Sequence, residues 1–273
     1  WTLPGGALEP GETLAQAAAR VVSRQTGITA HVERPIDLYY WDELNRLTIL
    51  FIGFPLNGER TPRKPHTQES RYFSPYALPD MPRAVMTLDA LAGSRPRLRH
   101  VELTDAERRL RLEQRPRGVK GRPRRQPESA PVRFNVQAVA VVTDQAYRRV
   151  LTLRRQRATV LPRIRLTRHL PPWNELAKAV KLGSGIAVPL RWVGVWHDAA
   201  QQTVDLIFAA TAREKVDLPE GAEWSLARNI ALPGQEAEYV ARVKPGYARQ
   251  SVWTISGRDS QVKAGDTIKQ RGK

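Results

Sequence analysis

An internal repeat constrains the fold of this chain more than any other feature of its sequence. Four separate blocks recur in the same order at an offset of 154 to 158 residues. Leu3-Pro4 corresponds to Leu161-Pro162, residues 19–22 correspond to 177–180, and Gly27-Ile28 corresponds to Gly185-Ile186. In the fourth block, Glu69 and residues 77–79 correspond to Glu223 and residues 231–233. Chance matches would not keep this order and spacing, so we predict a duplicated domain.

The two copies differ at their beginnings. The second copy carries two strand-like segments, 134–143 and 149–154, ahead of Leu161, whereas only two residues precede Leu3. We therefore expect the first copy to lack its first hairpin and to be truncated at its N-terminus. The total of 273 residues fits two domains of ordinary size.

The positive charge lies mainly outside the repeats. The net charge is +17, and residues 93–126 hold twelve basic residues against four acidic ones, while 244–273 hold seven against two. These stretches account for thirteen of the excess charges. We predict a domain over 1–102, a basic Pro/Arg-rich linker over 103–131, a second domain over 132–257 and a basic tail over 258–273.

The linker has two parts. Residues 103–114 favour a short charged helix, with Thr104 as N-cap and Glu107 at capping-box spacing. Residues 120–125 read Lys-Gly-Arg-Pro-Arg-Arg and look like an AT-hook core, which would place Lys120, Arg122, Arg124 and Arg125 on nucleic acid. The alternative is a basic, Pro-rich linker with general affinity for polyanions.

Residues 1–28 carry a spaced set of residues, Gly6, Glu12, Arg20, Val22, Gly27 and Ile28, which begins after Trp1-x-Leu3-Pro4-Gly5. This set is in register with the signature of the Nudix hydrolase family, and residues 1–6 match the usual lead-in of that signature, so the segment resembles that family. The resemblance implies an α/β (α+β) fold: two tandem α/β/α sandwiches with mixed sheets. The second copy resembles this family only because it corresponds to the first copy in the repeat.

The departures from this signature concern the metal ligands. The resemblance places the family's three metal-binding glutamates at Val21, Arg24 and Gln25. Mg²⁺ prefers carboxylate oxygens, which these three side chains do not provide. In the second copy the same positions are Ala179, Leu182 and Gly183, Leu170 replaces Glu12, and Arg163-Ile164 replaces Gly5-Gly6.

The first helix can still be assigned two roles. Leu14, Ala17, Ala18, Val21 and Val22 form an apolar stripe between an N-cap at Thr13 and a C-cap at Gly27. Its polar face could bind phosphate directly through Gly5, Gly6, Arg20 and Arg24. Alternatively this face is only solvated, with Arg20 bracing a loop carboxylate as the family's arginine does.

Other candidate residues have both functional and structural interpretations. Tyr39, Tyr40, Trp41, Trp192 and Trp196 could stack on bases or be buried in strands, and we favour burial. Glu9, Glu12, Glu69 and Glu223 are weak candidates for stray metal ligands or bases. His31, His66, His100, His169 and His197 show no metal-ligand spacing, and the chain has no cysteine.

Three functions follow from these features. The first is a non-catalytic Nudix pair that binds a nucleotide-type ligand, nucleic acid or another polyanion and needs no cofactor. The second is a residual hydrolase that cleaves a nucleoside diphosphate linked to another moiety with Mg²⁺ or Mn²⁺. The third is a structural ribonucleoprotein subunit. No apolar run is long enough to span a membrane, so we expect a soluble protein that is cytoplasmic or nucleoid-associated and has no membrane partner.

Overall fold

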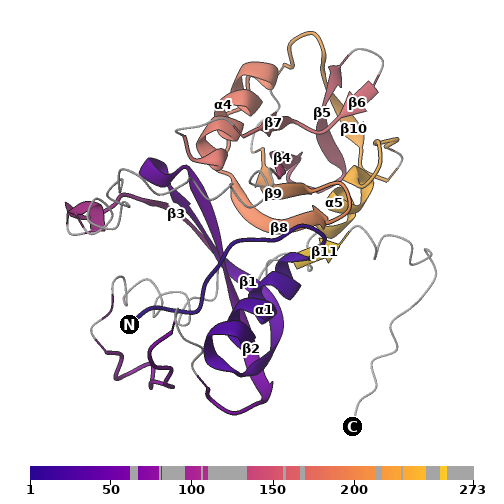
Figure 1. Ribbon diagram of the computed structural model, residues 1–273. Coiled ribbons are helices and arrows are strands. Elements are labelled where there is room, and N and C mark those ends of the chain that lie inside the picture. The colour runs from indigo at the N-terminus through magenta and orange to yellow at the C-terminus, as the bar shows by residue number, and fades with distance from the viewer. Residues whose placement is uncertain are drawn as a thin grey trace, which may run out of the picture.

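The computed structural model describes most of the two repeats and little of the segments between and after them. The described residues are 1–61, 67–79, 81, 96–105, 107–109, 134–155, 158–166, 170–212, 217–228, 230–243 and 253–256. The fold is a mixed α+β fold with two mixed sheets (Figure 1).

The first half of the chain forms one helix and a three-stranded sheet. Its elements in chain order are α1 (Leu14–Thr26), β1 (Thr29–Trp41), the 3-10 turn η1 (Asp42–Leu44), β2 (Arg46–Asn57) and β3 (Arg97–Val101). The sheet order is β2-β1-β3, with β1 antiparallel to β2 and parallel to β3. The predicted strand at 48–54 is confirmed as part of β2.

The second half forms a larger sheet between two helices. Its elements are β4 (Asn135–Thr143), β5 (Arg149–Arg155), β6 (Ala158–Val160), β7 (Arg163–Arg165), α4 (Pro172–Ser184), β8 (Arg191–Asp198), β9 (Thr203–Thr211), β10 (Ala222–Leu226), α5 (Glu236–Arg242) and β11 (Trp253–Ser256). The main sheet order is β10-β5-β4-β9-β8-β11. The two strands predicted ahead of Leu161 are confirmed as β4 and β5.

Part of this larger sheet repeats the pairing of the small one. β8 is antiparallel to β9 and parallel to β11, as β1 is to β2 and β3. α4 precedes β8 as α1 precedes β1. This correspondence is what a duplicated unit would produce, and it supports the tandem arrangement, which stays a prediction.

The two halves share one apolar core. Leu38 of β1 is fully buried and lies in the same cluster as Leu151 and Trp192, and Leu8 and Leu14 pack against that cluster. Burying a side chain of leucine size stabilises a fold by about 1.5–3 kcal/mol. A second cluster fills the opposite face of the large sheet, beneath α5. The loop before α1 is therefore held against the second half rather than exposed on all sides.

The start of the predicted linker packs on the first half. Thr104 and Glu107 form the predicted capping box, since the Thr104 N–H donates to Glu107 Oε2 at 2.7 Å and the Glu107 N–H donates to Thr104 Oγ1 at 3.3 Å. Arg108 forms an ion pair with Glu43 of η1 at 2.6 Å. The domain boundaries themselves stay predictions, and residues 110–133, with the AT-hook-like segment, lie outside the described residues.

Candidate functional site

The helix α1 has the termini that its sequence predicts. Thr13 is the N-cap: its Oγ1 accepts the N–H of Gln16 at 3.2 Å, and Gln16 Oε1 accepts the N–H of Thr13 at 2.7 Å. Gly27 ends the helix at φ +78°, in the left-handed region that glycine adopts without strain. Ala17 and Val21 are buried, as the apolar stripe predicts.

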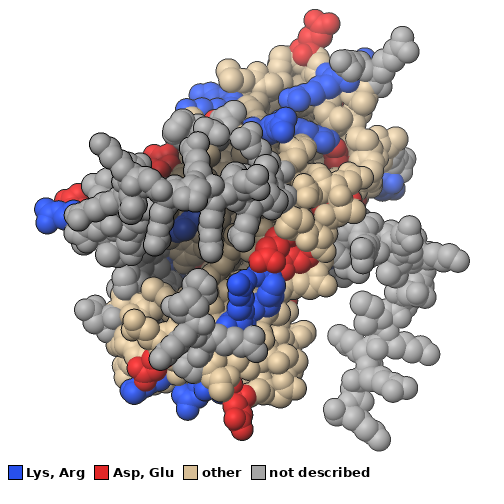
Figure 2. Space-filling view, in the orientation of Figure 1, with Lys and Arg blue, Asp and Glu red and all other residues tan. Residues whose placement is uncertain are grey.

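Arg20 of α1 braces the loop ahead of the helix. Its Nε donates to Glu12 Oε2 at 2.8 Å, and its Nη2 donates to Glu12 Oε1 at 2.6 Å and to the Ala7 carbonyl at 2.9 Å. Its Nη1 lies 2.9 Å from Glu9 Oε1. Figure 2 shows a group of acidic side chains directly beside a group of basic ones on this face of the molecule. The bracing interpretation is therefore the one that the contacts of Arg20 match.

The same contacts set the charge state of the loop. The hydrogen bond from Arg20 lowers the pKa of Glu12, and the hydrogen bond to Glu12 raises the pKa of Arg20. The Glu9 N–H also donates to Glu12 Oε1, at 2.6 Å. Glu12 thus stays ionised and has most of its acceptor capacity in use, which leaves it a poor ligand for a metal ion.

Gln25 occupies one of the three helix positions at which the family carries a glutamate. Its Nε2 donates to the Gly5 carbonyl at 2.9 Å, and its Oε1 accepts the Gly5 N–H at 3.2 Å. One amide therefore satisfies both backbone groups of Gly5. A carboxylate could accept the N–H, but it would face the carbonyl without a donor.

Val21 occupies the second of these positions and is packed against the loop. It is 6% exposed, and a Cβ built on Gly6 would lie 2.7 Å from Val21 Cγ2. The close approach of the loop to α1 therefore requires glycine at position 6. Arg24 occupies the third position and is exposed.

These three side chains do not fit a divalent cation. They offer a buried methyl group, a hydrogen-bonded amide and a positive charge, where Mg²⁺ prefers carboxylate oxygens. Within the described ranges, no group of three or more His, Asp and Glu residues is arranged to hold a metal ion. Gly5 and Arg20 are engaged internally, so of the predicted phosphate-binding residues Arg24 has the most accessible charge.

The side chains at the equivalent positions of the second half are even less suited to binding a metal ion. On α4, Leu182 is 86% exposed, and a Cβ on Gly183 would meet Leu153 at 3.4 Å. Arg163, in the position of Gly5, forms an ion pair with the buried Glu236 of α5. Burial lowers the pKa of Arg163.

A buried histidine lies where the two halves meet. His197 of β8 is 1% exposed, and within the described part of the chain neither ring nitrogen has a hydrogen-bond partner. Its ring lies 6.0 Å from that of Phe134. Burial lowers the pKa of His197, while the negative charges of Asp198 and Glu12 act in the opposite direction.

The remaining predicted residues have structural contacts. Tyr39, Tyr40, Trp192 and Trp196 are all at most 6% exposed, so the base-stacking interpretation is wrong for these four and strand burial is confirmed. Trp41 has Arg46 over its ring at 5.0 Å. Glu69 forms an ion pair with Arg71. His66 and His169, like Lys120, Arg122, Arg124 and Arg125, lie outside the described residues.

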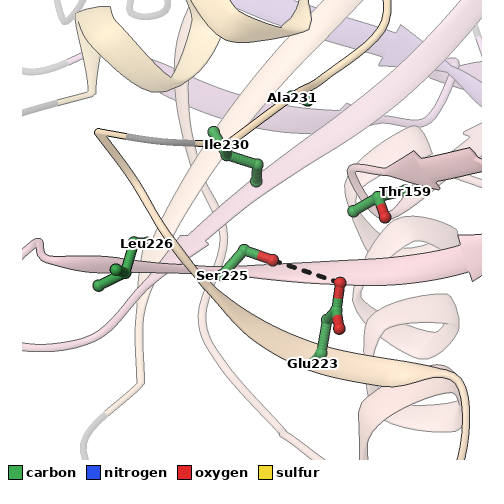
Figure 3. Close-up of a pocket in the computed structure, with 6 residues that line it drawn as sticks. All are labelled: Thr159, Glu223, Ser225, Leu226, Ile230 and Ala231. Carbon is green, nitrogen blue, oxygen red and sulfur yellow. Dashed lines mark hydrogen bonds between the residues drawn. The ribbon is translucent and has the colours of Figure 1, made fainter.

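Sequence reasoning singled out Glu223 but missed the pocket around it. Figure 3 shows this open pocket beside β10, lined by Thr159, Glu223, Ser225, Leu226, Ile230 and Ala231. Its residues come from β6, β10 and the segment before α5, and the farthest two, Thr159 and Ala231, are 72 positions apart in the sequence. No local pattern marks them as one group.

Comparison with known proteins finds a similarity in the first third of the chain. Residues 1–90 match the family model of the NUDIX domain. This match supports the resemblance to the Nudix family that the signature residues of this part of the chain predict.

The curated relatives resemble this chain over part of their length. Phosphatase NudJ of Escherichia coli (strain K12) is 34% identical over 70 residues, which are 25% of this chain and 46% of NudJ. A candidate 8-oxo-dGTP diphosphatase of Bacillus subtilis (strain 168) is 32% identical over 79 residues, which are 29% of this chain and 53% of that protein. The chain thus spans about half the length of the curated relatives it matches.

Two solved structures are similar at lower identity. The NUDIX hydrolase from Nitrosomonas europaea has a TM-score of 0.37 at 13% identity and covers 46% of this chain and 81% of its own. A MutT protein from Bacillus halodurans also has a TM-score of 0.37 at 13% identity and covers 45% of this chain and 90% of its own. Among the described residues, no helix is long and apolar enough to cross a membrane.

Proposed function

We propose that this protein is a non-catalytic member of the Nudix superfamily that binds a nucleotide-type ligand or nucleic acid. The observation that carries the proposal is the pair of hydrogen bonds between Gln25 and Gly5. Gln25 stands at a position where the resemblance to the family implies a metal-binding carboxylate. Without that carboxylate the helix keeps its packing role and loses the chemistry of a metal-assisted hydrolase.

The charge distribution supports a polyanionic ligand. Arg24 is exposed at the last turn of α1, and the predicted linker carries Lys120, Arg122, Arg124 and Arg125 in a six-residue segment. Lysine and arginine side chains in an extended segment bind phosphate and release counterions, which gives affinity without base recognition. Arg20 contributes to this function indirectly, by holding the loop through Glu9 and Glu12.

A residual hydrolase is the second candidate, and the names of the curated relatives favour it. It would need a metal site built from Glu9, Glu12 or Glu69. Each of these carboxylates forms an ion pair with an arginine, so metal binding would have to displace Arg20 or Arg71. A ribonucleoprotein subunit is the third candidate and rests on the +17 charge.

Calorimetric titration of the purified chain with Mn²⁺, followed by a hydrolysis assay on nucleoside diphosphate compounds, separates the first two candidates. We expect no stoichiometric Mn²⁺ binding up to millimolar concentration and no metal-dependent turnover. Metal-dependent turnover that Glu12→Gln abolishes would overturn the proposal. A matched variant with Arg24→Glu and Gln25→Glu restores two carboxylates, and we expect it to bind Mn²⁺ more tightly than the unaltered chain.

Salt dependence tests the nucleic-acid part of the proposal. The slope of log K against log salt is about −0.9 for each phosphate contacted on duplex DNA. Replacing Lys120, Arg122, Arg124 and Arg125 with alanine should therefore make the slope shallower by about 3–4 if all four contact phosphates. An unchanged slope and affinity would place binding elsewhere. Absence of binding to nucleotides, DNA and RNA would overturn the proposal and leave the subunit role.

A further inference from the structure

His197 lies on the face of the large sheet that meets the first half. It is directly opposite Val204 of β9, and Val195 lies two positions before it on β8. Both valines belong to the apolar cluster that contains Leu38 of β1. Cross-strand neighbours share a face of the sheet, and so do alternate residues of one strand. His197 therefore points toward the core that the two halves share.

The imidazole of His197 is buried without a hydrogen-bond partner. It is 1% exposed, and no group of the described residues hydrogen-bonds either ring nitrogen. A neutral imidazole carries one donor and one acceptor, whereas a protonated imidazole carries two donors and a positive charge. Burying an unpaired charge costs far more free energy than burying a neutral polar group. The observed arrangement therefore favours the neutral ring.

The loop ahead of α1 lies close to this imidazole. His197 is next to the last residue of β8, and both Leu8 of the loop and Phe134 pack against the cluster on its face. The negative charge of Glu12 is close enough to stabilise a proton on the ring. Figure 1 shows the N-terminal segment, in indigo, running past β8 before α1 begins. The burial of His197 therefore depends on the loop staying in place.

The two carboxylates nearest to the ring already have other partners. Glu12 forms an ion pair with Arg20 at 2.6 Å. Asp198 Oδ1 accepts two backbone N–H groups of the following turn, at 2.9 and 3.0 Å. Neither carboxylate hydrogen-bonds the ring. Each favours a proton on His197 only through its field, and a positive charge there would stay without a direct partner.

The other elements beside this imidazole supply no carboxylate to its face. On β9, Asp205 points to the opposite face of the sheet. β11 (Trp253–Ser256) contains no ionisable residue. On β3, His100 shares the face of Leu98, and its Nε2 lies 3.6 Å from Asp42 Oδ2. His100 is therefore the second titratable imidazole to test at this contact.

We propose that His197 is a pH-sensitive switch that releases the loop ahead of α1. When the ring binds a proton from solvent, the buried charge disfavours the docked loop, so residues 5–12 leave β8 and water reaches the imidazolium. Loss of the proton at higher pH allows the loop to dock again. Histidine is the side chain whose ordinary charge change lies between about pH 5 and 8. The switch acts on the contact between the loop and β8, and it does not depend on the proposed function.

Hydrogen exchange of the unaltered chain, measured by mass spectrometry between about pH 7.5 and 5.5, tests the switch. The Gly5 N–H donates to Gln25 and the Glu9 N–H donates to Glu12, so release of the loop exposes both amides. After correction for the intrinsic exchange rate at each pH, protection of the loop should fall up to about tenfold per pH unit below about 6.5, because one proton is bound. α5, on the opposite face, should keep its protection. Loop protection that does not change with pH would overturn the proposal.

Two variants and a matched control assign the effect to one ring. His197→Phe binds no proton, so its loop should keep constant protection over this pH range. His197→Gln, a smaller neutral side chain, should give the same result and replaces His197→Phe if the larger ring disturbs folding. His100→Phe removes the other imidazole of this contact and should behave as the unaltered chain does.

The remaining outcomes each contradict the switch. If loop protection still falls with pH in both His197 variants, another group controls the loop. If the fall is lost in His100→Phe and kept in His197→Phe, the responsible imidazole is His100. If α5 loses protection in parallel with the loop, acid unfolds the chain as a whole and does not release the loop.

Discussion

The side-chain amide of Gln25 hydrogen-bonds both the N–H and the carbonyl of Gly5, at 3.2 and 2.9 Å. The two residues are twenty positions apart, one in the last turn of α1 and the other in the loop ahead of it. This contact closes the loop onto the helix at the position where a metal-binding glutamate is implied. Gln25 therefore has a structural role at this position.

Replacing Gln25 with glutamate should destabilise the protein. The carboxylate keeps an acceptor for the Gly5 N–H but loses the donor to the Gly5 carbonyl, and the lost hydrogen bond is worth about 1 kcal/mol. Urea unfolding at pH 7 measures the change in the free energy of unfolding. Arg24→Gln, at an exposed neighbouring position, should change it by less than about 0.5 kcal/mol. Equal stability of Gln25→Glu and the unaltered chain would show that the contact contributes nothing.

Gly6 and Val21 form a second close contact between the loop and α1. An alanine Cβ at position 6 would lie 2.7 Å from Val21 Cγ2, so Gly6→Ala should cost about 1–3 kcal/mol of stability through overpacking. The double variant with Val21→Ala removes the colliding methyl and should recover part of that cost. A double-mutant cycle by urea unfolding measures the coupling, and strict additivity of the two changes would contradict the contact.

The elements of the fold could be predicted because their signals are local. The N-cap at Thr13, the C-cap at Gly27 and the capping box of Thr104 and Glu107 each depend on residues within one or two turns. The repeat added non-local information, since it predicted that α4 and β8 follow the order of α1 and β1.

The site could be predicted only in part because its contacts are non-local. The sequence marks Val21, Arg24 and Gln25 as departures from the family's pattern, but it does not indicate that Gln25 reaches back to Gly5. The ion pair of Arg163 with Glu236 joins residues more than seventy positions apart. The core shared by Leu38 and Trp192 depends on how the two halves pack together, and neither repeat encodes this packing on its own.

The ion pair between Arg20 and Glu12 predicts a loss of stability in acid. Arg20 lowers the pKa of Glu12, so the folded state holds Glu12 ionised at a pH where the unfolded chain protonates it. The stabilisation is present above the ordinary carboxyl pKa and is lost as the pH falls through the lowered value. Urea unfolding between pH 5 and 2.5 should show a smaller loss of stability for Glu12→Gln than for the unaltered chain. If the free energy of unfolding fell equally with pH in Glu12→Gln and in the unaltered chain, this role of Glu12 would be contradicted.

His197 predicts a second pH dependence in a different range. Burial lowers its pKa, so below the ordinary value of about 6.5 the unfolded chain binds a proton that the folded chain does not. Stability should therefore fall as the pH decreases from about 6.5 toward the lowered pKa, with a slope of at most about 1.4 kcal/mol per pH unit. Asp198 and Glu12 oppose this effect by stabilising the imidazolium. His197→Phe should make the free energy of unfolding less dependent on pH between pH 7 and 5, while the loss of stability at lower pH that involves Glu12 should remain. His100→Phe, at a half-exposed histidine, is the control. A slope that persists in His197→Phe would assign the pH dependence to another group.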